Sequence, residues 1–376
     1  MARRILLKGN EALGEAAILA GCRYFFGYPI TPQNEVPGYM ARRLPEVGGV
    51  FLQAESEVSA ISMVYGAAGA GVRVMTSSSS PGISLKQEGL SYLAASELPC
   101  VVANVMRAGP GLGGILASQS DYFQATKGGG HGDYRLVVLA PYSVQEMMDL
   151  TVLAFELADE YRNPVMILAD GVLGQMMEPV ELKQYPRREL PEKSWATTGA
   201  VGRPPNIVNS LFIDPEVLEQ RNLHLQKKYA RLSELEVRWE QEDIQEGCEV
   251  AVVAYGTMAR VARSAIRSAR ALGVNAGLFR PISLYPFPSS ALREAAKYAG
   301  GFLAAEMSMG QMVEDVRLAL EGRRPVGFYG RAGGIVPTPA EVTQAIVRMA
   351  AELRARGSAN VRVSGSEGIR QASGAH

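Results

Sequence analysis

The sequence predicts an α/β protein built on mostly parallel β-sheets. Short, continuously apolar runs alternate with longer segments of helical periodicity, an order that is typical of βαβ units. The runs are apolar throughout rather than at every second residue, as expected for strands that helices cover on both faces. A charged segment interrupts the alternation, which then starts again. For a chain of 376 residues we therefore expect two α/β domains.

The first domain is expected to span residues 1–182. Its strands are predicted at residues 24–28, 50–53, 72–76, 100–106, 136–139 and 165–168. Its helices are predicted at residues 9–20, 32–43, 57–70, 84–96 and 144–161. Thr31 suits the N-cap of the second helix, because its hydroxyl can accept a hydrogen bond from the first turn and Pro32 suits the first helical position.

A connecting segment, residues 183–246, is expected to separate the two domains. It is rich in proline at first and then becomes highly charged, which predicts a solvated helix over residues 214–245. The second domain is expected at residues 247–355. Its strands are predicted at residues 249–254, 275–279 and 301–305, and its helices at residues 259–272, 289–298, 311–320 and 339–354. The small, polar residues 356–376 are expected to be disordered.

Composition excludes several classes of protein. Lys plus Arg and Asp plus Glu both number 38, so no net positive charge attracts nucleic acid or an anionic membrane. The three cysteines, Cys22, Cys100 and Cys248, form no CxxC motif and are too few to bind an iron–sulfur cluster through four thiolates. No apolar run reaches the ~18 residues of a membrane span. We therefore expect a cytoplasmic protein without a metal site, a nucleic-acid partner or a membrane partner.

Polar residues follow three predicted strands, at the sheet edge where open α/β proteins bind ligands. The motif YPITP, residues 28–32, ends with a hydroxyl beside a predicted helix N-terminus, which would suit a carboxylate. Glu57 opens a helix after the second strand, although the helix dipole alone also favours glutamate there. Arg107 follows the fourth strand and is shaped either for bidentate carboxylate binding or for an ordinary salt bridge.

Glycine-rich and small-residue segments lie beside these positions. Gly109, Gly111 and Gly114 match a dinucleotide-binding fingerprint literally, but they come late in the domain and open no helix, so we interpret them as a mobile substrate loop. Residues 77–82 (SSSSPG) form either a ligand-binding turn or a plain strand–helix connection. A lone loop histidine such as His131 is more often solvated than functional.

In their order along the chain, these motifs resemble the alpha subunit of 2-oxoacid:ferredoxin oxidoreductases, most closely the 2-oxoisovalerate (branched-chain) type. The matching segments are YPITP (28–32), ESE (55–57), TSSSSPG (76–82), ELP (97–99), RAGP (107–110) and SDYFQATKGGGHGDY (120–134). Residues 248–350 resemble a transketolase C-terminal-like domain through AYG (254–256), RP (280–281), PFP (286–288) and EMSMGQ (306–311). The resemblance covers about residues 5–350 and implies that the first domain binds the pyrimidine ring of thiamine diphosphate.

The resemblance also implies roles for single residues. Glu57 matches the glutamate that contacts the pyrimidine ring, where a protonated carboxyl group hydrogen-bonds a ring nitrogen, so Glu57 is the expected catalytic residue. Thr31 matches the threonine near the substrate carboxylate, and Arg107 matches the arginine that pairs with it. The remaining expected cofactor-binding residues are Pro29, Ile30, Ser79 and Gly82.

The loop after Arg107 departs from one pattern of the family. Many members that act on 2-oxoglutarate carry a loop resembling GPSTGLPTK, whereas this chain has GPGLGGILASQSD. The lysine is absent, and Ile115 and Leu116 are apolar. Such a loop favours a branched aliphatic side chain over a second carboxylate, although a residue of a partner chain could supply the missing charge.

The implied reaction is oxidative decarboxylation of a 2-oxoacid to acyl-CoA and CO2, with coenzyme A as co-substrate and ferredoxin as electron acceptor. A beta subunit would share the thiamine diphosphate and supply the Mg²⁺ site and a [4Fe–4S] cluster. A separate gamma subunit and a ferredoxin-like delta subunit are further candidate partners. Alternatives are the same chemistry on 2-oxoglutarate or pyruvate, a non-oxidative decarboxylase subunit, and a non-catalytic assembly subunit. The roles of His131 and residues 183–246 stay open.

Overall fold

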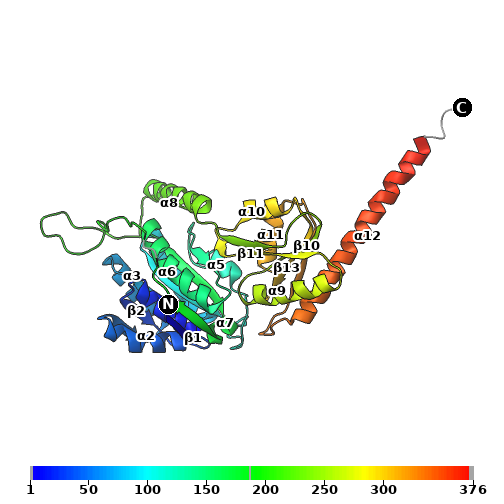
Figure 1. Ribbon diagram of the computed structural model, residues 1–376. Helices are drawn as coiled ribbons and strands as arrows, with labels where there is room; N and C mark the ends of the chain where they lie inside the picture. The colour runs from blue at the N-terminus through cyan, green and yellow to red at the C-terminus, as the bar shows by residue number, and fades with distance from the viewer. Residues whose placement is uncertain (1–2, 186–187, 372–376) are drawn as a thin grey trace.

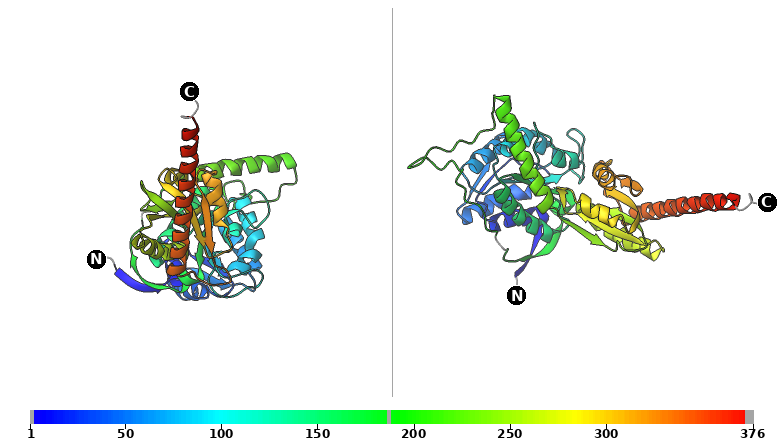
Figure 2. Two further views of the ribbon diagram at one scale, coloured as in Figure 1. Left: turned by 90° about the vertical axis from the view of Figure 1, so that its right-hand side faces the viewer. Right: turned by 90° about the horizontal axis from the view of Figure 1, so that it is seen from above.

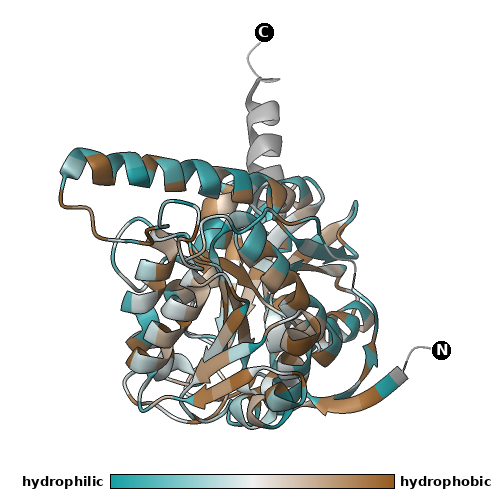
Figure 3. Ribbon diagram, turned by 90° about the vertical axis from the view of Figure 1, so that its left-hand side faces the viewer, coloured by the Kyte–Doolittle hydropathy of each residue, from teal (hydrophilic) through white to brown (hydrophobic). Residues whose placement is uncertain are grey.

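A computed structural model describes residues 3–185 and 188–371 of the chain. Two sheets with their covering helices lie next to each other, and helix α12 (Pro339–Gln371) projects away from them (Figure 1). Apolar residues gather in the interior strands, whereas the outward faces of the helices are more polar (Figure 3). The described part of the chain contains no helix that is both long enough and apolar enough to cross a bilayer.

The larger sheet has seven strands in the order β12-β6-β7-β5-β4-β2-β3. These strands are β2 (Tyr24–Gly27), β3 (Val50–Gln53), β4 (Val74–Ser78), β5 (Cys100–Met106), β6 (Val137–Leu139), β7 (Pro164–Asp170) and β12 (Ser283–Tyr285). All neighbours are parallel except β12, which pairs antiparallel with β6. Every residue of β4, β5 and β7 is buried, which agrees with their continuously apolar sequences.

Helices cover both faces of the large sheet. One face packs against α1 (Gly9–Leu19), α2 (Glu35–Glu46) and α6 (Val144–Tyr161), and the other against α3 (Glu57–Gly69) and α4 (Ser80–Ala95). The short helices α5 (Tyr122–Thr126) and α7 (Gly171–Gln175) lie in loops, and β1 (Arg3–Lys8) pairs antiparallel with β8 (Met177–Leu182).

The smaller sheet has five strands in the order β14-β13-β10-β11-β9. These strands are β9 (Trp239–Glu242), β10 (Cys248–Val253), β11 (Ala276–Pro281), β13 (Ala299–Glu306) and β14 (Val326–Gly330). Helix α9 (Gly256–Ala271) and the first half of α12 cover one face, and α10 (Ser289–Ala295) and α11 (Met312–Leu320) cover the other. Both sheets bear out the predicted α/β architecture with mostly parallel strands.

The predicted extent of the charged helix is wrong: α8 runs only from Pro215 to Leu235 rather than over residues 214–245. Most of α8 is exposed, as predicted, but Leu225, Tyr229 and Leu232 are buried in the core of the large sheet. The chain then forms β9 instead of more helix, because the alternating WEQE sequence pairs antiparallel with β11. Since β9 joins the small sheet and β12 joins the large one, the domain limits at residues 182 and 247 stay predictions.

The expectation that residues 356–376 are disordered stays a prediction. Helix α12 runs from Pro339 to Gln371 and so includes the first part of this segment. The last five residues lie outside the described part of the chain.

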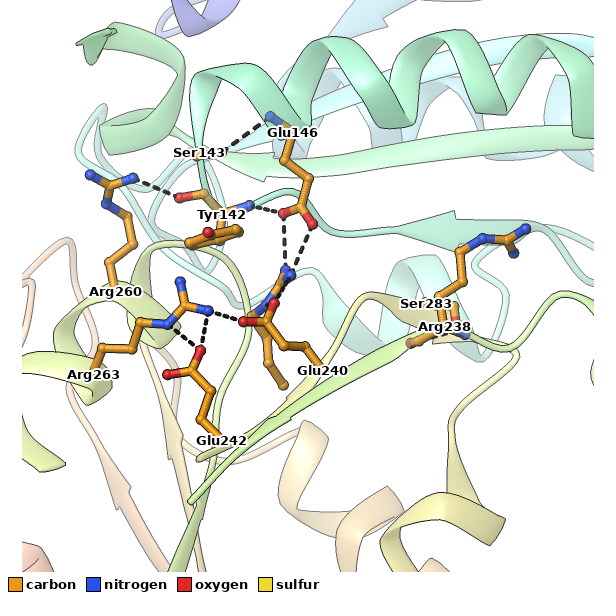
Figure 4. Close-up of polar contacts among 10 residues, drawn as sticks. Tyr142, Ser143, Glu146, Arg238, Glu240, Glu242, Arg260, Arg263 and Ser283 are labelled. Carbon is orange, nitrogen blue, oxygen red and sulfur yellow. Dashed lines mark hydrogen bonds and ion pairs between the residues drawn. The ribbon is translucent and has the colours of Figure 1, made fainter. Parts of the chain in front are cut away.

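A buried arginine cluster joins the two sheets (Figure 4). Arg280 of β11 is 1% exposed, and its two terminal nitrogens lie 2.9 Å from the two carboxylate oxygens of Glu146 on α6. Its Nε also donates to Glu240 of β9 at 2.9 Å, and its guanidinium lies 4.2 Å from the centre of the Tyr142 ring. A buried guanidinium needs such partners, since its desolvation is costly. This cluster therefore holds the two sheets in a defined orientation.

Candidate functional site

Arg107 lies at the carboxyl end of β5 and binds two backbone carbonyl groups. Its Nη1 donates to the carbonyl oxygen of Thr31 at 3.0 Å, and its Nη2 donates to that of Leu112 at 3.1 Å. The residue is 7% exposed, and its Nε has no hydrogen-bond partner among the described residues. Thr31 and Arg107 are thus neighbours, as the sequence predicts. Because carbonyl groups are neutral, they leave the positive charge of Arg107 available to an anion.

A polar network that sequence reasoning missed supports Arg107. The Arg107 N–H donates to the Ser80 hydroxyl at 3.0 Å, and this hydroxyl lies 2.6 Å from the Asp121 carboxylate. Asn104 also donates to Asp121, at 2.9 Å. Burial raises the pKa of Asp121, while these two hydrogen bonds oppose the rise. A buried asparagine within an apolar strand is the one signal in the sequence that could have revealed the network.

The surroundings of Thr31 differ from the expectation. Helix α2 begins at Glu35, with Asn34 as its N-cap residue, so Thr31 caps no helix. The Thr31 hydroxyl accepts a hydrogen bond from the Asn34 side chain at 3.3 Å. The carbonyl of the next residue, Pro32, accepts hydrogen bonds from the side chains of Asn10 and Gln175. The predicted helix N-terminus therefore does not contribute to an anion site here.

Glu57 occupies the first turn of α3, where the Ser56 hydroxyl caps the helix by accepting from the Ser59 N–H at 3.2 Å. The Glu57 side chain faces Gly82, in the first turn of α4. A Cβ atom on Gly82 would lie 2.6 Å from Glu57 Oε1 and 2.1 Å from Ser78 Oγ. Only glycine permits this approach. Helix α4 begins at Ser80, earlier than expected, because Pro81 suits a first helical turn, so Gly82 belongs to the helix and not to a preceding turn.

Lys86 is a second charged group beside Glu57. It is fully buried on α4, and its Nζ donates to the backbone carbonyl of Glu57 at 3.3 Å. Burial lowers the pKa of Lys86 to about 8, and the nearby Glu57 acts in the opposite direction. A single lysine in a helix carries no pattern from which this position could have been inferred.

Several buried polar atoms in and around β4 have no hydrogen-bond partner within the described ranges. They come from the end of β4, from the residue before α4 and from the turn after β2: Thr76 Oγ1, Ser78 Oγ, Ser79 Oγ and Gln33 Nε2. Burying such atoms without partners costs free energy, so native proteins rarely do it. These atoms therefore indicate a polar ligand that binds against β4 and α4.

A cavity of about 430 Å³ opens beside Arg107. Arg107, Ser80 and the glycine loop form one wall, and residues of the small-sheet half, among them Ser308 and Met309, form the other. Both halves of the chain thus line it, which sequence reasoning missed.

Other predicted residues lie outside this cavity. Ile115 and Leu116 are each 61% exposed, and Leu116 packs against Gly334. Pro29 is exposed and Ile30 is half-buried in the loop after β2. His131 is exposed in its glycine-rich loop, as expected for a solvated histidine. Within the described ranges, no three His, Cys, Asp or Glu side chains gather in a way that could hold a metal ion.

Solved structures with this fold confirm the predicted fold class. The 2-oxoglutarate:ferredoxin oxidoreductase from Magnetococcus marinus, solved with 2-oxoglutarate, coenzyme A and succinyl-CoA bound, matches with a TM-score of 0.82 and 28% sequence identity. The match includes 92% of this chain, and this chain spans 65% of the length of the Magnetococcus marinus chain. A split gene transketolase matches with a TM-score of 0.57 over 92% of this chain and 98% of the other. At 15% identity, that likeness shows the fold alone.

Sequence comparisons confirm the resemblance. Residues 15–233 match the family model for pyruvate flavodoxin/ferredoxin oxidoreductase, thiamine diphosphate-binding, and residues 248–342 match pyruvate:ferredoxin oxidoreductase core domain II. Ketoisovalerate oxidoreductase subunit VorB of Methanothermobacter thermautotrophicus is 56% identical, over 88% of this chain and 93% of its own. The 2-oxoglutarate synthase subunit KorA of the same organism is 38% identical, over 93% of this chain and 100% of its own. The chain belongs to the 2-oxoacid:ferredoxin oxidoreductase family.

Proposed function

We propose that this chain is the pyrimidine-binding, catalytic subunit of an enzyme that oxidatively decarboxylates a 2-oxoacid to acyl-CoA and CO2 and delivers the electrons to ferredoxin. The observation that carries the proposal is the set of unpaired buried polar atoms in and around β4, one of which, Ser78 Oγ, faces Gly82 together with Glu57. A nitrogen-rich ring is a ligand that such hydroxyl and amide groups suit. Thiamine diphosphate, when bound, supplies the nucleophilic carbon and the electron sink that decarboxylation requires.

Glu57 is the residue to which we assign proton handling. Its side chain is 6% exposed and lies against Gly82, so water has little access to the carboxyl group. There, Glu57 would hold a proton on a carboxyl oxygen and donate a hydrogen bond to a ring nitrogen. Ser79, Gly82, Pro29 and Ile30 are the other residues that we propose would hold the cofactor.

Arg107 and Thr31 would bind the carboxylate of the 2-oxoacid. The guanidinium is already oriented by two backbone carbonyls, so little side-chain entropy is lost when an anion binds. Its unpaired Nε and its uncompensated charge support this role. The hydroxyl of Thr31, whose backbone carbonyl binds Arg107, would add a neutral hydrogen bond.

A branched aliphatic 2-oxoacid, such as 2-oxoisovalerate, is the substrate that we propose. Ile115 and Leu116 lie outside the cavity of this chain, but they offer exposed apolar surface on the loop that also binds Arg107. No lysine stands in that loop to pair with a second carboxylate. The higher identity to the ketoisovalerate oxidoreductase subunit than to the 2-oxoglutarate synthase subunit supports the same choice.

The chain would need partner subunits. Its three cysteines are free, buried thiols, fewer than the four that a [4Fe–4S] cluster takes. We propose that a beta subunit supplies the cluster, Mg²⁺ and the diphosphate site, and that gamma and delta subunits complete the complex with coenzyme A and ferredoxin. Free thiols also suit a cytoplasmic location.

The test is CoA-dependent dye reduction by the purified complex over a panel of 2-oxoacids. Branched-chain acids should give the highest kcat/KM, and Glu57→Gln should reduce kcat by about 10²-fold or more without loss of subunits. The matched control is Glu55→Gln, since Glu55 is exposed one turn before Ser59 and its carboxylate accepts a hydrogen bond from that residue's hydroxyl. Near-normal turnover by Glu57→Gln would refute the catalytic role, and a clear preference for 2-oxoglutarate would refute the substrate assignment.

A further inference from the structure

Asp121 lines the same cavity as Arg107 and is the other charged residue on its wall. It directly precedes α5, which lies where the large-sheet and small-sheet halves of the chain meet (Figures 1 and 2). Gln311 of the small-sheet half holds this segment, because its side chain donates to the Ser120 carbonyl at 2.7 Å and accepts from the Phe123 N–H at 2.8 Å. The carboxyl group of Asp121 therefore has a defined place on the cavity wall.

The two oxygens of the Asp121 carboxyl group have different surroundings. Oδ2 accepts hydrogen bonds from the Ser80 hydroxyl at 2.6 Å and from the Asn104 side chain at 2.9 Å. Among the described residues, Oδ1 has no hydrogen-bond partner. Because the residue lines the cavity, this second oxygen is available to a ligand that binds there.

The charges around Asp121 favour a carboxyl group that keeps its proton. Burial raises the pKa of Asp121, and no cation of the described residues is paired with it. Arg107 instead donates to the backbone carbonyls of Thr31 and Leu112. Tyr255, the titratable group that faces Asp121 from the small-sheet half, stays neutral because burial raises its pKa well above the usual value.

A bound substrate would strengthen this preference. When the carboxylate of a 2-oxoacid binds Arg107, a second anion enters the cavity that Asp121 lines. Two carboxylates that share a small space do not both ionise readily, so one of them holds a proton more tightly. The substrate carboxylate is paired with arginine, and the proton therefore resides on Asp121.

The proposed reaction requires a proton in this cavity. Attack on the 2-oxo carbon turns the C=O bond into a C–O single bond, and the oxygen gains negative charge unless it takes a proton. The oxo group lies on the carbon next to the substrate carboxylate, so Arg107 places it in the same part of the cavity. A single hydroxyl joins the two charged residues there, since Ser80 Oγ accepts from the Arg107 N–H at 3.0 Å and also bonds Asp121.

We propose that Asp121 is a further catalytic residue, the acid that donates a proton to the 2-oxo oxygen, an inference that rests on the proposed function. The O–H bond of its carboxyl group breaks, and an O–H bond forms at the substrate oxygen. Asp121 remains as a carboxylate, which the hydrogen bonds from Ser80 and Asn104 stabilise. After CO2 has left and ferredoxin has taken the electrons, the acyl C=O bond re-forms and the proton returns to Asp121.

The test is Asp121→Asn in the purified complex, assayed by CoA-dependent dye reduction. The amide oxygen can still accept from Ser80 and Asn104, so the cavity wall should persist, but the amide has no acidic proton to give. We expect kcat to fall by about 10²-fold or more while KM for the 2-oxoacid stays within about threefold of wild type. Asp133→Asn, at an exposed aspartate farther along the chain, is the matched control and should leave kcat unchanged.

Asp121→Ala separates proton donation from positioning. Its smaller side chain leaves room for a small acid, so added ammonium ion should raise its kcat at least about tenfold, compared with sodium chloride at equal ionic strength. Ser80→Ala removes the hydrogen bond to Oδ2 but keeps the acid, so ammonium should not raise its kcat. Near-normal kcat for Asp121→Asn would overturn the inference, as would a loss in Asp121→Ala that ammonium does not restore.

Infrared spectra give a result that does not depend on turnover. With isovalerate, a carboxylate without an oxo group, bound to the complex, the wild type should show the band of a protonated carboxyl group at pH 7. Asp121→Asn should lack this band and Asp133→Asn should retain it; a band that persists in Asp121→Asn would overturn the inference. If the wild-type complex shows no 2-oxoacid-dependent activity, the proposed function fails, and the band still decides whether Asp121 holds a proton beside a bound anion.

Discussion

Gly82→Ala tests whether the position of Glu57 matters for catalysis. The new methyl group would lie 2.6 Å from Glu57 Oε1, so this carboxylate oxygen must move by roughly 1 Å to reach an ordinary contact distance. Both clashing atoms, Glu57 Oε1 and Ser78 Oγ, belong to side chains that can rotate, so unfolding free energy should fall by only about 1–3 kcal/mol. A catalytic group displaced by 1 Å can cost about 10²-fold in rate. We therefore expect kcat to fall by about 100-fold in a protein that still folds.

The assay is CoA-dependent dye reduction at saturating 2-oxoacid and thiamine diphosphate, together with urea unfolding. Gly38→Ala is the control, because Gly38 lies on α2 and a Cβ there meets no atom within 4 Å. Glu57→Asp adds a second test, since the shorter side chain leaves room for the methyl group. Gly82→Ala should then cost much less in a Glu57→Asp background than in the wild type. A kcat within about twofold of wild type for Gly82→Ala would refute the reasoning.

Three further predictions concern charged residues. Arg107→Lys keeps the positive charge but loses the planar, two-pronged guanidinium group. We therefore expect kcat/KM for the 2-oxoacid to fall by about 10–100-fold while KM for coenzyme A stays unchanged. An unaltered kcat/KM would contradict the role of Arg107 in carboxylate binding. Lys86 has its folded pKa lowered to about 8, below its unfolded value, so its stability contribution should rise with pH above 8. The difference in unfolding free energy between the wild type and Lys86→Met should therefore increase by about 2 kcal/mol from pH 7.5 to pH 9.5. If this difference stays constant over that range, Lys86 is not a buried lysine that titrates there. Arg280→Met leaves the Glu146 carboxylate without its ion pair, whereas Glu240 keeps its pair with Arg263. The substitution should cost about 3–5 kcal/mol in urea unfolding, more than Arg263→Met at a more exposed site.

Local patterns in the sequence were sufficient for most of the fold. Continuously apolar runs identified the buried strands β4, β5 and β7, because strands covered on both faces admit few polar residues. The positions of Thr31 and Arg107 at strand ends followed from the same pattern, because the carboxyl ends of parallel strands share one edge. Their contact in the structure agrees with this reasoning.

Such local patterns did not predict which strands pair with strands that are distant in the sequence. Strand β12 joins the large sheet although its sequence lies within the expected second domain, and β9 joins the small sheet from within the expected connecting helix. Neither segment carries a local signal for its partner, since strand pairing depends on distant residues. The burial of α8 residues in the core of the large sheet was hidden for the same reason, because most of that helix is charged.

By itself, the sequence determined the α/β class, the order of the strand-end motifs and a cysteine count too low for a cluster, since each of these depends on nearby residues or on composition alone. Only the tertiary structure decided which groups share a site. It brought Gly82 against Glu57, buried Lys86 beneath that residue and placed Asp121 behind Arg107. It also showed that the apolar side chains of Val201, Ile207 and Ile213 are exposed, because exposure is a property of the packed chain and not of its residues.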